Sequence, residues 1–315
     1  MMKVELHCHL DGSLNVDFVD EMLRSRGIVY ERAELKKKLE VRPDCASLSE
    51  YLEKFDLPLL CLQTKYGLEK AAYELVRDVS KEDVRYIEVR FAPMLSVSEG
   101  LTCREVIASV VSGLQKGQTE FGVYASAIVC AMRHHSLEQN MEMLEASREF
   151  VGKGVCAFDL AGDEAAFPTS LFRDLFMQAR AWDIPFTIHS GECGSVENVR
   201  EAIELGAKRI GHGIALQESS ELRALCREKR IGIEMCPTSN LQTKAVLDFA
   251  EYPLKDFLSE GLLVSIHTDN RTVSGTTLEK EQAYFDKTIV RLCTLNAIDT
   301  AFTNEQIKKE LRGML

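Results

Sequence analysis

Residues 3–14, KVELHCHLDGSL, join a short apolar strand pattern to a polar turn that carries two histidines. An open, doubly wound α/β sheet usually has a glycine-rich phosphate loop, GxGxxG, directly after its first strand. Here the turn reads HCHLDGS and contains no such loop. The stretch therefore disfavours the open sheet and favours a closed barrel, provided that the rest of the chain supplies parallel strands.

Seven further apolar, β-branched runs of strand length follow the first, and amphipathic stretches separate them. The eight predicted strands are 3–6, 86–91, 123–130, 155–159, 185–188, 209–211, 232–235 and 263–266. Strands that alternate with helices need crossover connections and so form a parallel sheet. Eight such units in a chain of 315 residues predict an α/β fold, the (β/α)8 TIM barrel.

Start and stop signals mark the helices between these strands. Capping boxes are expected at Ser47 with Glu50, Thr102 with Glu105, Ser136 with Gln139 and Thr276 with Glu279, and C′ glycines at Gly206 and Gly261. The segment 16–83 is too long for one crossover helix, so we expect a helical insertion after the first strand, beside the barrel mouth. No linker, repeat or low-complexity tract divides the sequence, and residues 1–315 are expected to form a single domain.

The composition narrows the classes of partner. The chain has 38 basic and 49 acidic residues, a net charge of −11, which disfavours nucleic acid and anionic membranes but not a small neutral substrate. No apolar run approaches the roughly 18 residues of a transmembrane helix, and the N-terminus lacks a signal-peptide pattern. The ten cysteines form no CxxC motif, so reduced thiols and a cytoplasmic location are expected.

Five polar residues lie at or just beyond the carboxyl ends of predicted strands. His7 and His9 are spaced i, i+2 on the first strand, so both side chains point to the same side; alone, this pair is most simply a chance pattern. His189, His212 and Asp269 end the fifth, sixth and eighth strands. Barrel active sites are built at this face, and imidazole and carboxylate ligands suit zinc. If the chain folds as a barrel, these residues are therefore expected to meet at one end of it and form a zinc site.

The remaining polar candidates are Glu192 and three further histidines, and each has both a functional and a structural interpretation. Glu192 follows His189 in a glycine-containing turn. A carboxylate near a metal and out of water has a raised pKa and could donate a proton, although a turn glutamate is more often a surface residue. His134 and His135 are expected to have supporting or surface roles, and His267 is expected to pack rather than to bind a metal.

An apolar stripe lies within the predicted insertion. Leu48, Tyr51, Leu52 and Phe55 have the i, i+3, i+4, i+7 spacing of one helix face. Core packing of the insertion is the simpler interpretation. If the helix overhangs the barrel mouth, the stripe would instead form the wall of an apolar pocket.

Seven motifs occur together in a fixed order: KVELHCHLDGSL, CAMRH, DLAGDE, HSGE, RIGHG, CPTSN and HTDN. Their combination resembles the adenosine deaminase family of metal-dependent hydrolases, from residue 4 to about residue 279. The resemblance implies a (β/α)8 barrel with one zinc ion (Zn2+) per chain. The residues that match the family's metal ligands are His7, His9, His189 and Asp269.

The resemblance also implies roles around the metal. Glu192 matches the residue that protonates purine N1, and His212 matches the histidine that orients or deprotonates the attacking water. Gly162 matches the glycine whose backbone N–H meets purine N3, and Asp11 matches the residue that contacts ribose. The predicted apolar stripe corresponds to the family's lid segment, which strengthens its interpretation as a pocket wall.

One motif departs from the family pattern. The family often has two aspartates and a proline after the eighth strand, whereas Asp269 is followed here by Asn270 and Arg271. The second aspartate usually contacts purine N7, and the Asn270 amide can donate a hydrogen bond to the same atom. Arg271 is expected to alter the wall near the base or sugar.

The function implied is zinc-dependent hydrolysis of adenosine and 2′-deoxyadenosine to inosine and 2′-deoxyinosine plus ammonia, a reaction of purine salvage. Alternatives are deamination of adenine or of a 5′-modified adenosine, or a non-catalytic zinc-binding barrel protein. The Asp11 carboxylate favours a ribose with a free 5′-hydroxyl over a 5′-phosphate. The expected partner is therefore a small-molecule purine nucleoside.

Overall fold

The computed structural model describes residues 1–42, 45, 48–193 and 195–315, with the backbone alone at Leu48 and Ser49. Its strands are β1 (Lys3–His9), β2 (Val84–Phe91), β3 (Tyr124–Met132), β4 (Val155–Ala161), β5 (Thr187–Ser190), β6 (Arg209–His212), β7 (Gly232–Met235) and β8 (Leu263–Ile266). All eight predicted strands are present. Several run further toward their carboxyl ends than predicted, and β1 includes both of its histidines because neighbouring strands continue to hydrogen-bond it there.

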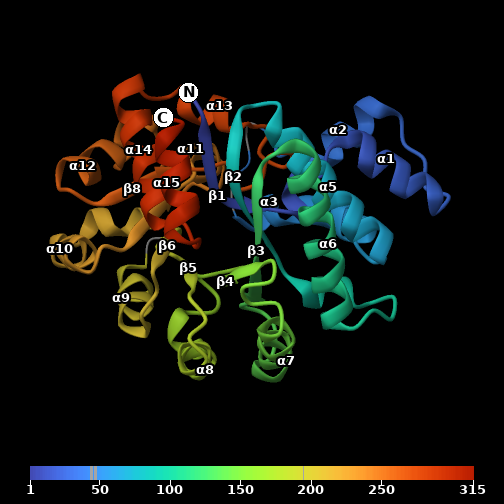
Figure 1. Cartoon of the computed structure of the whole chain (residues 1–315), viewed down its shortest axis with the longest axis horizontal. Helices are drawn as coiled ribbons and strands as arrows, with labels where there is room; N and C mark the ends of the chain where they lie inside the picture. The colour runs from blue at the N-terminus through green and yellow to red at the C-terminus, as the bar shows by residue number, and fades with distance from the viewer. Residues whose placement is uncertain (43–44, 46–47, 194) are drawn as a thin grey trace.

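The strands form two parallel four-stranded sheets, β1-β2-β3-β4 and β5-β6-β7-β8, which close on each other. At one junction the Phe158 N–H donates to the Pro185 carbonyl at 3.0 Å. At the other, the His9 N–H donates to the Asp269 carbonyl at 2.7 Å, and the Asp269 N–H donates to the His7 carbonyl at 2.8 Å. The predicted (β/α)8 barrel is thus confirmed (Figure 1).

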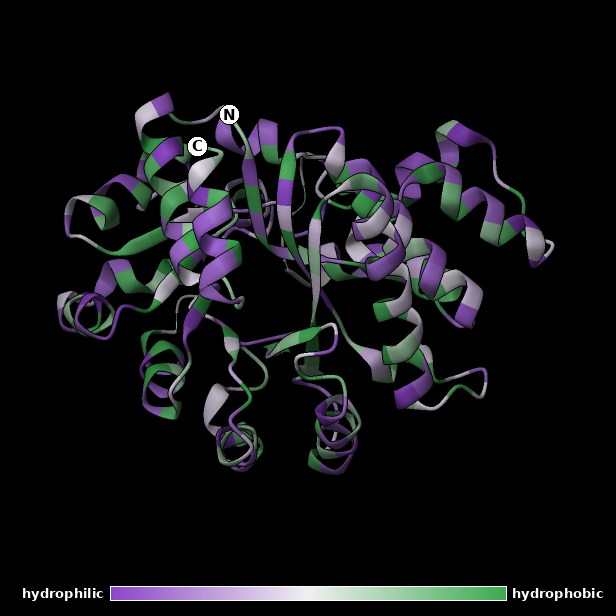
Figure 2. Cartoon of the chain, in the orientation of Figure 1, coloured by the Kyte–Doolittle hydropathy of each residue, from purple (hydrophilic) through white to green (hydrophobic). Residues whose placement is uncertain are grey.

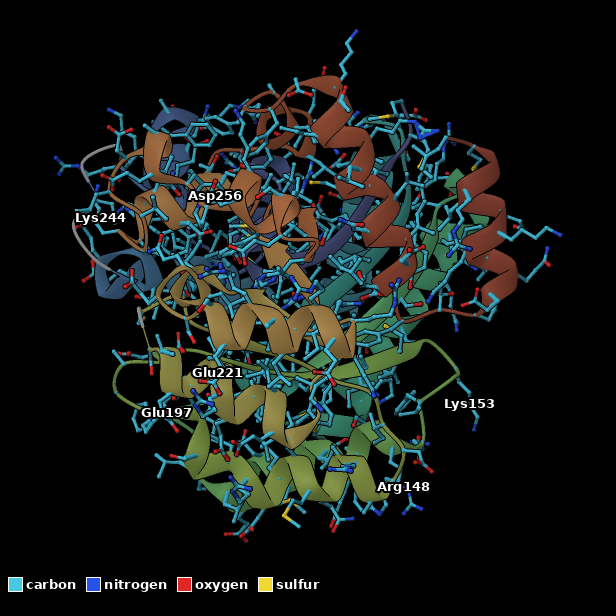
Figure 3. The ribbon with its side chains drawn as sticks, turned by 90° about the vertical axis from the view of Figure 1, so that its left-hand side faces the viewer. Arg148, Lys153, Glu197, Glu221, Lys244 and Asp256 are labelled. Carbon is cyan, nitrogen blue, oxygen red and sulfur yellow. The ribbon has the colours of Figure 1, made fainter. Side chains whose placement is uncertain are left out.

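A ring of helices surrounds the strands (Figure 1). The ring comprises α5 (Lys65–Ser80), α6 (Cys103–Phe121), α7 (Leu137–Arg148), α8 (Arg173–Ala181), α9 (Val196–Leu205), α10 (Ser220–Lys229), α12 (Leu254–Ser259) and α14 (Lys287–Thr300). Three more helices are α11 (Pro237–Gln242), α13 (Leu278–Gln282) and α15 (Glu305–Gly313). The helices carry both hydrophobic and hydrophilic residues (Figure 2). Labelled charged side chains such as Lys153 and Glu197 point outward (Figure 3).

The helical insertion after β1 is also confirmed. It contains α1 (Val16–Ser25), α2 (Arg32–Leu39), α3 (Leu48–Leu52) and α4 (Asp56–Cys61), all before the crossover helix α5. In Figure 1, α1 and α2 lie outside the ring beyond α5, whereas α3 lies close to the strands. Within the part of the chain that the structure describes, no helix has both the length and the apolar character needed to cross a bilayer.

Two capping boxes and both glycine stops form as predicted. Thr102 and Ser136 each accept a hydrogen bond from the N3 backbone, and the N3 side chain accepts one in return. Gly206 ends α9 with a φ of 101°, and Gly261 follows α12 with a φ of 81°. These glycines supply the left-handed backbone that stops each helix.

The cap predicted at Thr276 is wrong by one residue. Thr277 caps α13 by accepting from the Lys280 N–H, because the Thr276 hydroxyl donates instead to the buried Glu281 carboxylate. Ser47, the first residue of the remaining predicted box, lies outside the described residues.

The barrel has an apolar layer outside and a polar interior. The main hydrophobic cluster lies between strands and helices and includes Cys8, Val89 and Ile188. Charged side chains fill the interior and are fully buried; they are Glu5, Glu88, Arg90, Asp159, Arg209 and Glu234. Buried charges are costly unless they are paired, so this interior must be an organised network of ion pairs and hydrogen bonds.

Candidate active site

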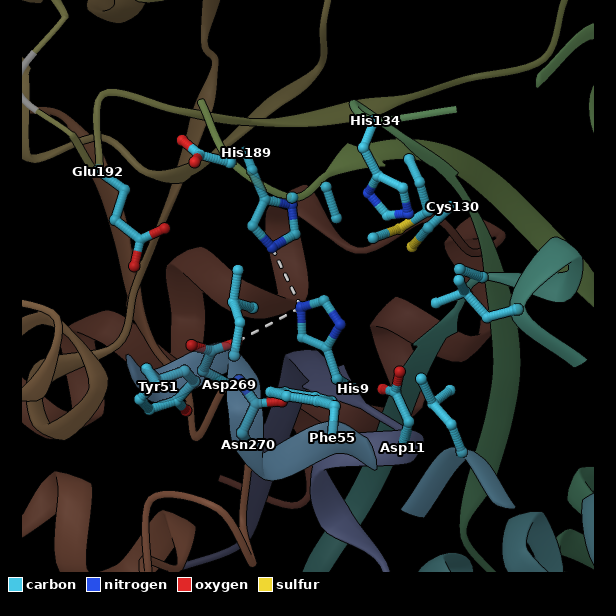
Figure 4. Close-up of a pocket in the computed structure, with 18 of the residues that line it drawn as sticks. His9, Asp11, Tyr51, Phe55, Cys130, His134, His189, Glu192, Asp269 and Asn270 are labelled. Atoms are coloured by element: carbon cyan, nitrogen blue, oxygen red, sulfur yellow. Dashed lines mark hydrogen bonds and ion pairs between the residues drawn. The ribbon is translucent and has the colours of Figure 1, made fainter. Parts of the chain in front are cut away.

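Four potential metal ligands converge at the carboxyl end of the barrel. His7 and His9 come from β1, His189 from β5 and Asp269 from the turn after β8, and their ligand atoms all lie within 4.8 Å of one another. His9 Nε2 is 3.1 Å from His189 Nε2 and 3.4 Å from Asp269 Oδ1 (Figure 4). Ligands about 2.05 Å from a tetrahedral zinc would stand roughly 3.3 Å apart, which these spacings match.

Two buried carboxylates orient the histidines. His7 Nδ1 lies 2.8 Å from Glu234 Oε2, and His189 Nδ1 lies 3.2 Å from Asp159 Oδ1. Such contacts hold the proton on Nδ1 and turn the Nε2 lone pair toward the cluster. His7 Nε2 is buried and has no hydrogen-bond partner among the described residues. An unpartnered nitrogen acceptor close to three other potential ligand atoms fits a divalent cation.

The pKa values of these four residues also suit metal binding. Burial, with help from Arg90, lowers the pKa of His7 to about 4, and burial lowers the pKa of His9 well below its usual value. Burial would raise the pKa of Asp269, but the neighbouring histidines, foremost His7 with its Nε2 3.4 Å from Asp269 Oδ1, hold it well below normal. At His189 the Asp159 carboxylate outweighs burial and raises the pKa, so a metal would displace a proton there.

Glu192 lies beside this cluster in the turn between β5 and α9. Gly191, with a φ of 77°, lets the chain turn so that Glu192 faces the pocket (Figure 4). Burial raises the pKa of Glu192, although nearby His212 opposes the shift. The Glu164 carboxylate accepts the N–H groups of Gly191, Glu192 and Cys193 at 2.6, 3.0 and 3.1 Å. One buried side chain therefore fixes the whole turn.

His212 faces Glu192 across the site. Its Nε2 is 3.7 Å from Glu192 Oε2, and its Nδ1 is 3.0 Å from the Asn240 amide nitrogen. The Tyr252 hydroxyl donates to Asn240 Oδ1 at 2.9 Å. His212 and Asp269 have positive φ values of 64° and 59°, a backbone strain that is costly for non-glycine residues and clusters at functional sites.

A cavity of about 300 Å³ opens beside these groups, at the lower end of the range for small-molecule sites. Tyr51, Leu52 and Phe55 line it, and the Tyr51 hydroxyl is 2.7 Å from Ser274 Oγ. The side chain of Leu48 is not among those described. The stripe is not one continuous α-helix as predicted, because α3 ends at Leu52 and a 3₁₀ turn over Glu53–Phe55 completes it.

The other predicted substrate contacts also line the cavity. Asp11 is buried, accepts the Gly12 N–H at 3.1 Å and has its pKa raised to about 6 by burial. Gly162 has a φ of 106°, and among the described residues its N–H has no hydrogen-bond acceptor. Asn270 Oδ1 is buried without a partner in that same part of the chain. These groups are available to a ligand.

Arg271 does not behave as expected. It is absent from the described lining of the cavity and pairs instead with Glu82. Among the remaining histidines, His134 lines the cavity wall, whereas His267 is buried and bonded to Glu5 and Ser265, which agrees with the predicted packing role.

The residues that support the site, notably Arg90, Asp159, Glu164 and Glu234, were not predicted from the sequence. A usable signal exists for three of them. Each of Arg90, Asp159 and Glu234 interrupts an apolar strand, in YIEVRF, CAFDLA and GIEM, where an ionisable residue is unusual unless it is paired. Glu164 carries no local signal, since its role depends on a turn 27 residues away.

Comparison with known proteins agrees with this geometry. The sequence profile of the adenosine deaminase family matches residues 2–315. An adenosine deaminase from Enterococcus faecalis is 43% identical, covering 98% of this chain and 94% of that protein. An amidohydrolase from Burkholderia ambifaria with bound zinc superimposes with a TM-score of 0.90 at 24% identity, covering 99% of this chain and 89% of its own. The N6-methyl-AMP deaminase of Arabidopsis thaliana gives 0.87 at 25% identity, covering 100% and 96%. The chain therefore belongs to the adenosine deaminase family and is a hydrolase that acts on C–N bonds.

Proposed function

We propose that this protein is a zinc-dependent deaminase of adenosine and 2′-deoxyadenosine, which it converts to inosine and 2′-deoxyinosine with release of ammonia. The observation that carries the proposal is the convergence of Glu192 and His212 beside the four potential ligands, at the edge of a cavity of nucleoside size.

His7, His9, His189 and Asp269 would hold the metal. When bound, zinc lowers the pKa of a coordinated water from 15.7 toward about 7 and so makes hydroxide available at neutral pH. The nitrogen-rich donor set favours zinc over magnesium or calcium, which prefer oxygen ligands. Zinc is also the metal bound to the B. ambifaria amidohydrolase of the same fold.

The protein's own groups activate the purine. A protonated Glu192 would donate to N1, which draws electrons from the ring and makes C6 electrophilic. The raised pKa of Glu192 keeps a larger share of this carboxyl protonated at neutral pH, and activity should fall as the pH rises above that pKa. His212 would orient the attacking water from the opposite side of the site.

Three further groups would position the substrate. The unpaired Gly162 N–H would donate to N3, and the Asn270 amide would donate to N7. Asp11 would accept a hydrogen bond from the ribose. Together these contacts would place C6 beside the water, and such orientation is a major part of catalysis.

The charge of the cavity favours a nucleoside over a nucleotide. Five carboxylates line it, namely Asp11, Asp56, Asp163, Glu192 and Asp269. No lysine or arginine is found among its described lining residues. A 5′-phosphate would meet these acidic side chains with no lysine or arginine among the described lining residues to bind it, so we do not expect AMP or N6-methyl-AMP to be substrates.

The test follows the loss of absorbance near 265 nm with zinc-loaded protein. Adenosine should be deaminated, adenine and AMP should react far more slowly, and Glu192→Gln should lose about 10²- to 10⁴-fold in kcat. Glu197→Gln, a substitution on the exposed surface of α9, is the matched control and should keep full activity. Preference for adenine or AMP would overturn the substrate, and inertness toward every 6-aminopurine would overturn the reaction.

A further inference from the structure

A buried arginine inside the barrel connects the two carboxylates that orient His7 and His189. Arg90 on β2 is fully buried. Its Nη1 donates to Asp159 Oδ2 at 2.8 Å, and its Nη2 donates to Glu234 Oε2 at 2.7 Å and to the Leu6 carbonyl at 2.8 Å. Asp159 belongs to the first four-stranded sheet and Glu234 to the second, so a single guanidinium links the two sheets beneath the ligands.

Each of these two carboxylates also contacts one histidine. Glu234 Oε2, which accepts from Arg90, is the same atom that lies 2.8 Å from His7 Nδ1. Asp159 Oδ2, also an Arg90 acceptor, lies 3.0 Å from His189 Nδ1. The orientation of both imidazoles therefore depends on where one planar group holds two oxygen atoms.

We propose that Arg90 is a positioning residue that couples His7 and His189 and thereby sets the affinity and geometry of the metal site. The inference rests on the metal site of the proposed function. A guanidinium has donors at fixed positions in one plane and can hold two carboxylates at once, whereas a lysine ammonium is a compact point charge on a shorter reach. Loss of groups that orient metal ligands typically weakens metal binding 10- to 100-fold.

The chain offers a matched control. Arg209 is equally buried and also joins two carboxylates, Glu88 and Glu234, but it contacts Glu234 through Oε1 and makes no contact with Asp159. Arg209→Lys should lower stability while leaving the Arg90 bridge and both histidine contacts in place.

The experiment measures binding rather than turnover. The Zn²⁺ dissociation constants of chelator-stripped wild type, Arg90→Lys, Arg90→Met and Arg209→Lys are determined by competition with a chromophoric chelator. The visible absorption of each Co²⁺-loaded protein reports ligand geometry. We expect at least a 10-fold higher Kd and an altered Co²⁺ spectrum for the Arg90 variants, and a Kd within about threefold of wild type for Arg209→Lys. Circular dichroism of the stripped proteins checks folding.

The outcomes separate the two claims. An unchanged Kd and Co²⁺ spectrum in Arg90→Lys, or an equal loss of affinity in Arg209→Lys, would overturn the positioning role alone. A wild type that binds no divalent metal would overturn the proposed function and this inference with it. If neither Arg90 variant folds, Asp159→Asn and Glu234→Gln are measured singly and together. A combined loss that differs more than threefold from the product of the single losses supports coupling, and agreement within threefold refutes it.

Discussion

Tyr252 is not among the described residues that line the cavity, but it acts through Asn240 on His212, which does line it. Its hydroxyl bonds Asn240 Oδ1, which orients the amide whose nitrogen meets His212 Nδ1. With Nδ1 as an acceptor, a neutral His212 carries its proton on Nε2, the atom that faces Glu192. A change at Tyr252 should thus alter the nitrogen of His212 that is proposed to act on the substrate side.

Tyr252→Phe should therefore lower kcat about 3- to 10-fold, which corresponds to one hydrogen bond of about 1 kcal/mol, and leave the Zn²⁺ affinity unchanged. The Asn240 amide would be free to turn over and His212 would lose its fixed tautomer. Steady-state kinetics and a metal titration test this, with Tyr124→Phe, which loses a hydrogen bond to Glu310 far from the cavity, as the control. A wild-type kcat in Tyr252→Phe would show that the chain of contacts does not matter.

At the scale of elements, the turn after β5 is held by one side chain. Glu164 accepts three consecutive N–H groups from 191–193, and Gln in its place offers only one oxygen. We expect Glu164→Gln to lower kcat 10- to 100-fold, since a misplacement of about 1 Å can cost 10²-fold. Hydrogen exchange of the three amides should accelerate in parallel. Full activity, or exchange no faster than in Glu197→Gln, would contradict the clamp.

The junction between α11 and α13 should make stability depend on pH. Buried Glu281 accepts the Thr238 N–H at 3.0 Å, and burial raises its pKa to about 7. Because the folded pKa lies above the unfolded value near 4.3, stability is greatest when Glu281 is protonated. Stability falls as the pH rises from about 4.3 to about 7, by as much as about 4 kcal/mol.

Glu281→Gln keeps a neutral side chain at every pH. Its Tm should exceed that of wild type by several degrees at pH 8.5 and match it near pH 4.5. Thermal unfolding at both pH values tests this, with the exposed Glu279→Gln on the same helix as the control. A pH-independent difference would mean that folding does not raise the pKa of Glu281.

At the scale of the whole molecule, the four proposed metal ligands connect both sheets across the point where the barrel closes. His7 and His9 lie on β1, His189 on β5 and Asp269 beyond β8. A metal ion that binds only the folded state stabilises it by about 4 kcal/mol when the free metal concentration is 1,000 times Kd. Chelation should therefore lower the Tm by several degrees, and Zn²⁺ should restore it where Mg²⁺ does not. An unchanged Tm in protein shown by elemental analysis to have lost its metal would contradict this.

Much of this architecture is local enough to be predicted from sequence. Apolar, β-branched runs of strand length predicted all eight strands, and the long segment before β2 indicated the insertion. The strand-end residues His7, His9, His189, His212 and Asp269 pointed to one face, because parallel strands in a barrel all end there.

Only the tertiary structure decided which charged side chains pair with one another. Arg90 meets Asp159 and Glu234 across 69 and 144 residues of chain, and no periodicity encodes which buried charges become partners. The same applies to Arg271, which the sequence placed near the substrate and the fold turned toward Glu82. Local pattern fixes which residues are buried or stand at a strand end, since it reflects backbone geometry over a few residues. The pairing of side chains inside the barrel depends on how the two sheets close, which is a property of the whole chain.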